Sequence, residues 1–206
     1  MVSSKNTLYY VHDPMCSWCW GFSKTWQEVK KLLPNSINIQ YILGGLSPDN
    51  NEAMPTEMRE YVQLNWKKIE QKIPGVKFNY DFWTKCSPKR STYPACRAVI
   101  AVKNQNLKLS IKMIELIQQA YYLEAKNPSE DSTLVSLADS LNLDIDQFIS
   151  DLNSKQTQQK LLDDITLAQS LGAHGFPSLV LKTKNGIEPI AIDYNNSITI
   201  LNQINT

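Results

Sequence analysis

Strand-forming patterns are confined to the two ends of this chain, which restricts the folds that it can adopt. Residues 7–12 form a short run rich in β-branched and aromatic side chains and predict a strand. From Cys16 to Leu33 apolar residues recur every three or four positions, which predicts a helix. Residues 37–43 alternate apolar and polar side chains and predict a second strand. Because a helical crossover joins the two strands, they should run parallel in one sheet.

The middle of the chain, from 46 to 172, is nearly free of strand patterns. Six helices are expected there, at residues 54–73, 94–106, 110–125, 132–141, 144–152 and 155–171. β structure returns at residues 178–182 and 187–192, which predict a hairpin around a turn at 184–186. Residues 197–204 are compatible with a closing helix.

This order of elements predicts an α/β fold in which one sheet domain is interrupted by helices. We expect residues 1–45 and 173–206 to form the sheet domain and residues 46–172 to form an all-helical insertion. The length of 206 residues suits one domain with such an insertion.

The composition favours no highly charged macromolecule as a partner. Lysines and arginines number 21 against 20 acidic residues, a formal net charge of +1, so neither nucleic acid nor an anionic membrane is expected to bind. No apolar run approaches the roughly 20 residues of a membrane-spanning helix, so no membrane insertion is expected. The opening Met-Val-Ser-Ser-Lys-Asn lacks the pattern of a secretory signal, which predicts a cytoplasmic protein, or a periplasmic one if a leader has been removed.

Cys16-Ser17-Trp18-Cys19 is the motif with the clearest chemistry. Thiol–disulfide exchange requires a thiolate, and the free N–H groups and dipole of a helix N-terminus favour that form. Cys16 stands where the first strand has ended and the helix begins, and Cys19 lies on the same side of the first turn. We therefore expect Cys16 to be an exposed nucleophile and Cys19 to be a buried thiol that resolves a mixed disulfide.

Other uses of the cysteines compete with this interpretation. A Cys-x-x-Cys pair also forms half of a zinc site, but the chain has no second ligand pair of tight spacing, so no metal is expected. The candidates for the missing ligands are His12, Cys86, Cys96 and His174. Cys86 and Cys96 either pack separately, one in a loop and one in a helix, or form a second redox pair. Separate packing is favoured.

A proline far downstream supports the redox interpretation. Pro177 follows a glycine-containing turn and directly precedes the apolar strand at 178–182, which makes it a good candidate for a cis peptide bond. Alone, this signal is weak. Combined with an upstream Cys-x-x-Cys in a strand–helix–strand unit, it is strong.

These motifs together resemble those of a known family. The segment Asp-Pro-Met-Cys-Ser-Trp-Cys-Trp-Gly-Phe at 13–22, with Gly-Phe-Pro at 175–177, resembles the DsbA-type branch of the thioredoxin superfamily. Within that branch it is most similar to the predicted cytoplasmic protein-disulfide isomerases that carry Cys-Ser-Trp-Cys-Trp-Gly-Phe. Pro-Ala-Cys-Arg-Ala at 94–98 also resembles a stretch typical of that group. The resemblance spans the whole chain.

The resemblance implies a DsbA-like thioredoxin fold, in which helices flank a central mixed β-sheet and a large helical insertion interrupts it. It implies that Cys16 forms the mixed disulfide, that Cys19 resolves it, and that Pro177 is cis and packs beside the pair. No cofactor is implied beyond the redox-active disulfide, because electrons pass to thiols such as glutathione or thioredoxin-type partners.

The resemblance also assigns roles around the pair. Gly175 and Phe176, just before the proline, belong to the substrate-binding segment, and Phe176 would offer backbone groups to a bound peptide as an added strand. Ser17 and Trp18 lie between the cysteines, where such proteins tune the thiol pKa and the redox potential.

One position departs from the family pattern. Thioredoxins and DsbA have a buried acidic residue six positions before the first cysteine, and this chain has Tyr10 there. His12 and Asp13 are nearer to the pair and are the candidates to replace it. We hypothesise that His12 or His174 lies within reach of the pair and tunes it; the alternative is a loop histidine without a role.

The function expected from these residues is thiol–disulfide oxidoreductase or isomerase activity on protein and peptide disulfides. An aromatic cluster on the first helix would offer an apolar surface to unfolded peptides; its members are Trp18, Trp20, Phe22 and Trp26. A redox-linked adaptor that binds protein partners through the same fold is the alternative. A glutathione-dependent isomerase or transferase of the same branch is disfavoured, because those enzymes typically have serine where this chain has Cys16.

Overall fold

The computed structural model describes residues 6–204 and contains one mixed four-stranded sheet in the order β2-β1-β3-β4. β1 (Asn6–His12) pairs in parallel with β2 (Ile37–Leu43), as the helical crossover predicts. β1 pairs on its other side with β3 (Ser178–Thr183), which is antiparallel and forms a hairpin with β4 (Gly186–Ile190). The sheet therefore joins segments from both ends of the chain.

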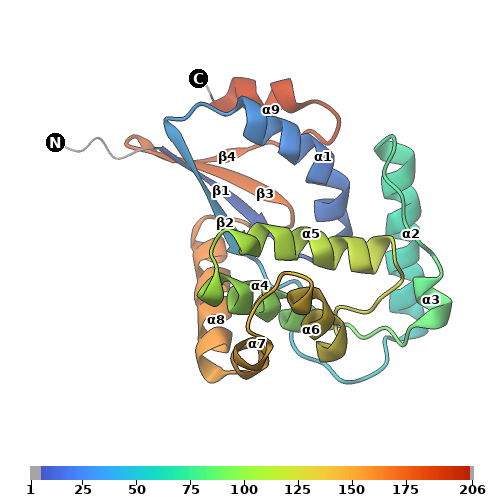
Figure 1. The fold of residues 1–206 in the computed structure, drawn as a ribbon. Coiled ribbons are helices and arrows are strands. Elements are labelled where there is room, and N and C mark those ends of the chain that lie inside the picture. The colour runs from blue at the N-terminus through green and yellow to red at the C-terminus, as the bar shows by residue number, and fades with distance from the viewer. Residues whose placement is uncertain (1–5, 205–206) are drawn as a thin grey trace.

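Helices cover both faces of this sheet (Figure 1). On one face α1 (Ser17–Leu32) and α9 (Ser197–Ile204) pack on an apolar layer that includes Leu8 and Tyr10 of β1. On the other face α8 (Lys155–Ser170) packs against Val11 of β1. The alternation of side chains along β1 sends odd and even residues to opposite faces, which is why one strand supplies both layers.

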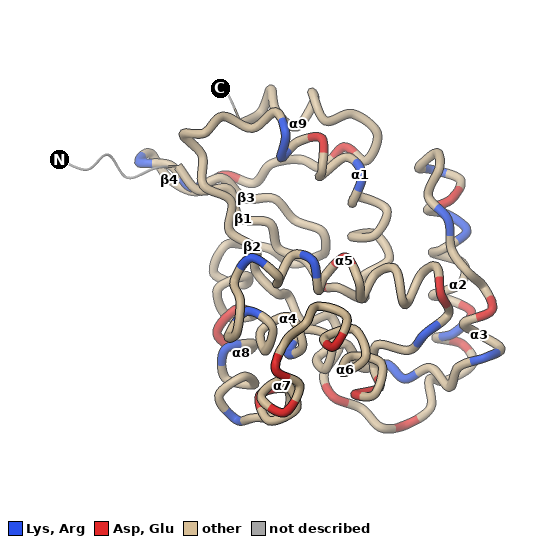
Figure 2. The backbone as a smooth tube through the Cα atoms, viewed as in Figure 1, with Lys and Arg blue, Asp and Glu red and all other residues tan. Residues whose placement is uncertain are grey.

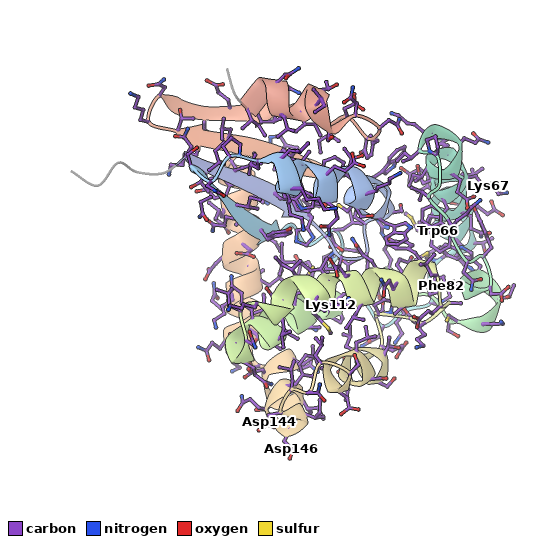
Figure 3. All side chains as sticks on the ribbon, turned by 45° about the horizontal axis from the view of Figure 1, so that its top comes forward. Trp66, Lys67, Phe82, Lys112, Asp144 and Asp146 are labelled. Atoms are coloured by element: carbon purple, nitrogen blue, oxygen red, sulfur yellow. The ribbon has the colours of Figure 1, made fainter. Side chains whose placement is uncertain are left out.

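Every element of regular secondary structure assigned between β2 and α8 is a helix. Its helices are α2 (Thr56–Lys72), α3 (Phe82–Lys85), α4 (Tyr93–Gln105), α5 (Leu109–Tyr122), α6 (Asp131–Asp139) and α7 (Ile145–Leu152). They share a core in which the fully buried Trp66 of α2 is ringed by aromatic side chains, among them Phe82 and Tyr122. Figure 3 shows Trp66 on the inner side of α2 and its neighbour Lys67 on the outer side.

The six helices expected in this block are all present, with small differences at their ends. The short α3 is additional, because four residues are too few to show helical periodicity. The last strand ends at Ile190 rather than at residue 192. The assignment of 46–172 as a separate domain stays a prediction.

Charged residues of both signs are spread over the helices, as the colours along α2 show in Figure 2. None of the helices within residues 6–204 combines the length and apolar character needed to cross a membrane.

Candidate active site

The cysteine pair lies at the N-terminus of α1. Cys16 is the N-cap residue, with extended backbone angles (φ −79°, ψ 117°), and the helix begins at Ser17. Its N–H donates to the Asp13 carbonyl (3.0 Å), and its own carbonyl accepts from the Trp20 N–H (3.1 Å). No acidic side chain occupies the first turn. The Cys16 side chain thus stands at the end of the helix where the free N–H groups of the first turn lie.

The Cys16 side chain is buried, so the expectation that it faces solvent is wrong. Cys16 is 5% exposed and Cys19 is 0% exposed, and both are free thiols. The reason is a contact that is remote in sequence: the Cys16 Sγ donates to the carbonyl of Phe176, 160 positions away, at 3.5 Å. The segment before β3 thus covers the sulfur.

A pocket of about 230 Å³ gives access to this sulfur. Ser17 and Trp18 of the motif line it, as do Gly175 and Phe176 from the opposite segment. The peptide bond between Phe176 and Pro177 is cis, as expected from the sequence. The structure thus brings the two predicted motifs together around one small cavity.

Burial controls the protonation of the second cysteine. The absence of solvent around Cys19 raises its pKa well above the usual value for a thiol, and the neighbouring Cys16 raises it further, while a hydrogen bond from the Asp13 backbone opposes the shift. Tyr10, which stands where thioredoxins and DsbA have a buried acid, lies close to the pair: burial, then the charges of Cys19 and Cys16, raise its own pKa. Cys19 is therefore held as a neutral thiol at neutral pH.

Asp13 is a buried acid beside the pair, and its carboxylate organises the surrounding loops. One oxygen accepts from the Met15 N–H (2.8 Å), and the other accepts from the Leu46 N–H (2.7 Å) and the Thr92 hydroxyl (2.7 Å). The Cys96 thiol also donates to it, at 3.5 Å. Burial raises the pKa of Asp13, and these hydrogen bonds partly oppose the rise. Asp13 was, with His12, a candidate from the sequence to replace the family's buried acid, but its donors at Leu46 and Thr92 are remote in sequence and were not predicted.

The two histidines have different surroundings. His174 is exposed and lines the pocket at Cys16. His12 is 1% exposed; its ring stacks on Tyr10 (5.0 Å between centroids, 12° between planes) and meets Tyr41 edge-on. It lines a different cavity from the one at Cys16. A role for His12 in tuning the cysteine pair stays a prediction. Its ring contacts Tyr10, which lies close to the pair.

The aromatic cluster of α1 is divided between core and surface. Phe22 and Trp26 are buried under the sheet, whereas Trp18 and Trp20 are partly exposed. The Trp18 ring packs on Tyr194 (5.2 Å between centroids), and the Lys72 ammonium lies over the Trp18 ring at 5.6 Å. Only the two partly exposed rings can therefore offer surface to a peptide.

Comparison with protein families decides the assignment of the fold. A family model described as thioredoxin matches residues 9–202. The chain belongs to the thioredoxin family. Among solved structures, a proposed protein disulfide isomerase from Nitrosomonas europaea matches this thioredoxin-family chain with a TM-score of 0.84 and 24% identity, over 98% of this chain and 97% of that one. The cytosolic disulfide reductase DsbM from Pseudomonas aeruginosa matches with a TM-score of 0.75 and 25% identity, over 90% and 89%. The DsbA-like thioredoxin fold is confirmed.

Curated relatives carry a different description. The ClpXP adapter protein SpxH of Bacillus subtilis (strain 168) is 21% identical over 199 residues, which cover 96% of this chain and 65% of the relative. SpxH of Halalkalibacterium halodurans is 23% identical over 182 residues, 86% of this chain and 59% of that protein. This thioredoxin-family chain thus spans about three fifths of the length of these relatives.

The remaining cysteines are engaged separately. Cys96 lies in α4 and is fully buried against Asp13, whereas the half-buried Cys86 donates to the carbonyl of Ala125 at 3.0 Å. The separate acceptors favour the packing interpretation over a second redox pair. Within residues 6–204 no group of three or more histidine, cysteine or acidic side chains is arranged to hold a metal ion.

Gly44 controls the position of the Phe176 ring. A Cβ at Gly44 would overlap that ring, so Gly44→Ala should displace it and with it the carbonyl that meets Cys16. Because the Phe176 segment covers the Cys16 sulfur, we expect a several-fold faster reaction of Cys16 with a small disulfide probe, followed by stopped-flow fluorescence, in a protein that still unfolds cooperatively. Gly175→Ala is the steric contrast, because a Cβ there would meet no atom within 4 Å apart from its chain neighbours, and its effect should be smaller. Equal effects of the two variants would contradict this steric explanation.

The buried His12 predicts a specific loss of stability in acid. Burial lowers its pKa from 6.5 to about 3, so the unfolded chain takes up this proton first as the pH falls. Stability that is fully present above pH 6.5 is therefore lost as the pH falls towards 3. Between pH 6.5 and about pH 4.5 we expect wild type to lose roughly 2–3 kcal/mol more than His12→Phe, measured by urea unfolding of both proteins. Parallel pH profiles would disprove it.

Proposed function

We propose that this protein is a thiol–disulfide oxidoreductase that acts on protein and peptide disulfides through Cys16 and Cys19. The observation that carries the proposal is the contact of the Cys16 sulfur with the Phe176 carbonyl at the pocket, at the N-terminus of α1. At this position the reacting sulfur lies next to a backbone carbonyl that can bind a substrate peptide. The neighbouring disulfide reductase DsbM from Pseudomonas aeruginosa supports this reaction class.

The proposed reaction follows from the different environments of Cys16 and Cys19. The Cys16 thiolate attacks one sulfur of a substrate disulfide, and the other substrate sulfur leaves as a thiolate. Cys19 then loses its proton and attacks the Cys16 sulfur, which releases the substrate thiol and forms the Cys16–Cys19 disulfide. Two electrons pass from the pair to the substrate. Since burial holds Cys19 protonated, its deprotonation is the step that the surrounding polar groups, Asp13 among them, must assist.

The substrate is held by the segment opposite the pair. The Phe176 carbonyl now accepts from Cys16, and a bound peptide would compete for it as an added strand. Gly175 and Pro177 shape this segment, and Ser17 and Trp18 contribute the pocket wall on the α1 side. Glutathione is a candidate thiol partner, because a similar structure of DsbM was solved with it. We place the reaction in the cytosol, where that reductase acts.

The test is catalysis by the wild-type protein. We expect it to accelerate either the reduction of insulin disulfides by a small thiol or the recovery of a scrambled disulfide substrate. The reduction potential of the Cys16–Cys19 pair sets the direction: a value near about −270 mV indicates a reductase and one near about −120 mV an oxidant. Inactivity in both assays would overturn the proposal.

A protein-binding adaptor is the second candidate, and the match to SpxH proteins favours it. Tyr61 and Leu64 of α2 are 59% and 54% exposed and offer an apolar surface for a protein partner, at the edge of the pocket at Cys16, which Tyr61 also lines. Biological activity that survives the Cys16→Ser/Cys19→Ser double substitution would favour this candidate. Loss of that activity would favour the enzyme.

A further inference from the structure

A second cavity lies alongside the edge strand β2, separate from the pocket at Cys16. Its volume is about 420 Å³, inside the range of roughly 300–1,000 Å³ that is typical of sites for small organic molecules. Apolar side chains from three elements form its walls, among them Ile39 of β2, Ile100 of α4 and Ile114 of α5. The two cavities share none of their lining residues. The two cavities are therefore distinct sites.

His12 is a deeply buried polar residue in the wall of this cavity. Neither ring nitrogen has a hydrogen-bond partner among the described residues, although the side chain is almost fully buried. Burial keeps the ring neutral, so one nitrogen donates and the other accepts. A buried polar group without a partner is costly, and buried histidines normally have one. A hydroxyl can serve either nitrogen, because it both donates and accepts.

Lysines dominate the outer end of the cavity. Lys103 and Lys108 are exposed at the mouth, and Lys30 of α1 is half-buried there. The acidic group in the wall is Asp164, which accepts a hydrogen bond from the Leu43 N–H at 3.1 Å. Lys103 interacts electrostatically with this carboxylate, and Lys30 with Glu115. With three lysines against these two carboxylates, the mouth favours an anion.

We propose that this cavity binds a small organic acid with an apolar aromatic or branched body, a hydroxyl at its inner end and a carboxylate at its outer end. The hydroxyl bonds with the His12 imidazole, and the body lies between the isoleucines of β2, α4 and α5. The carboxylate faces Lys103 and Lys108. The bound acid contacts His12, whose ring stacks on Tyr10. Tyr10 in turn interacts with Cys19.

Calorimetric titration of the reduced wild-type chain tests the proposal, and it does not depend on redox activity. The probes are para-hydroxyphenylpropionate, phenylpropionate, which lacks the hydroxyl, and tyramine, in which an ammonium replaces the carboxylate. We expect saturable binding of the first at one site and binding of the second weaker by roughly tenfold. Tyramine should bind more weakly than either. Absence of saturable binding by the first probe, or equal affinity for all three, would overturn the proposal.

Two variants locate the bound acid, and a third is the control. His12→Phe keeps an aromatic ring and should abolish the preference for the hydroxyl, whereas Lys103→Gln, at an exposed position, should weaken both acids. Lys67→Gln, an exposed lysine on α2 outside the cavity, should bind like wild type. Unchanged binding in both His12→Phe and Lys103→Gln would place the probe elsewhere and sink the proposal.

Discussion

Cys16→Ser is expected to reduce disulfide exchange to the uncatalysed background. The serine hydroxyl fits the space of the thiol. It cannot form the covalent bond to a substrate sulfur on which disulfide exchange depends. The helix N-terminus and the Phe176 carbonyl then act on a group without redox chemistry. Insulin reduction and recovery of a scrambled substrate measure the loss. Substantial activity in the variant would show that the Cys16 sulfur is not the nucleophile.

The matching change at Cys19 should have a different outcome. Cys19→Ser leaves the nucleophile in place and removes the thiol that resolves the intermediate, so a mixed disulfide on Cys16 should accumulate. Non-reducing electrophoresis and mass spectrometry detect that adduct. Cys86→Ser is the control, because this half-buried thiol only donates to the Ala125 carbonyl, which a serine hydroxyl also does. Cys86→Ser should retain wild-type exchange, and an adduct mapped to Cys86 instead of Cys16 in the Cys19→Ser protein would count against the assignment.

The local part of the site could be predicted from the sequence because local rules control it. Helical spacing after residue 16, the strand patterns at both ends and the glycine-containing turn before Pro177 each depend on a few adjacent residues. The cis bond and the position of Cys16 at the start of α1 follow from such patterns. Parallel pairing of β1 with β2 follows from the length of the crossover.

The features that could not be predicted depend on contacts between remote segments. The burial of Cys16 comes from Phe176, and no local pattern shows that this carbonyl reaches the sulfur. The role of Asp13 depends on donors at Leu46 and Thr92, which only the folded chain brings to one carboxylate. His12 belongs to the same class: strand alternation did not show which way its ring points, and the cavity beside it lies between β2 and two helices of the middle block, α4 and α5.

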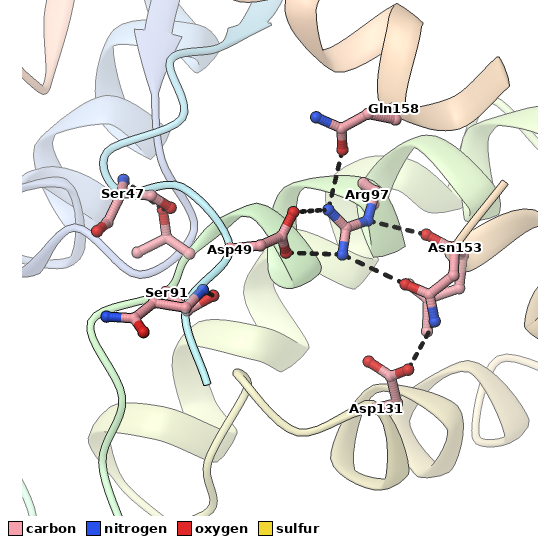
Figure 4. A network of polar contacts seen from close by, with 10 residues as sticks. Ser47, Asp49, Ser91, Arg97, Asp131, Asn153 and Gln158 are labelled. Carbon is pink, nitrogen blue, oxygen red and sulfur yellow. Dashed lines mark hydrogen bonds and ion pairs between the residues drawn. The ribbon is translucent and has the colours of Figure 1, made fainter. Parts of the chain in front are cut away.

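Arg97 connects the middle block to the loop beside the active site. Both of its terminal nitrogens bind the Asp49 carboxylate, at 2.7 and 2.9 Å, and its Nε donates to the Leu152 carbonyl at 3.0 Å. Gln158 of α8 and Asn153 after α7 accept further bonds at 2.9 and 3.3 Å (Figure 4). The Arg97 side chain is 9% exposed, so nearly all of its hydrogen bonding is supplied by the protein.

Arg97→Met should therefore lower the free energy of unfolding by roughly 2–4 kcal/mol. The methionine fills similar space, but it leaves the Leu152 carbonyl without its donor and the Asp49 loop without its anchor. We expect the loss of stability to fall in the lower part of the range for broken buried ion pairs, because Asp49 is 53% exposed and water can solvate it. Urea unfolding measures the change, and a loss within about 0.5 kcal/mol would show that the network is not stabilising.

Arg97→Lys separates the charge of this residue from its geometry. Lysine keeps a cation near Asp49 but cannot make the paired bonds of the guanidinium, so its stability should lie between wild type and Arg97→Met. In the loop that Asp49 anchors, the Ser47 N–H donates to the Thr92 hydroxyl, and that hydroxyl donates to Asp13 beside the cysteines. Loosening that loop should also shift the reduction potential of the Cys16–Cys19 pair. Stability lost without any change in potential would show that the Arg97 network supports the fold and not the redox site.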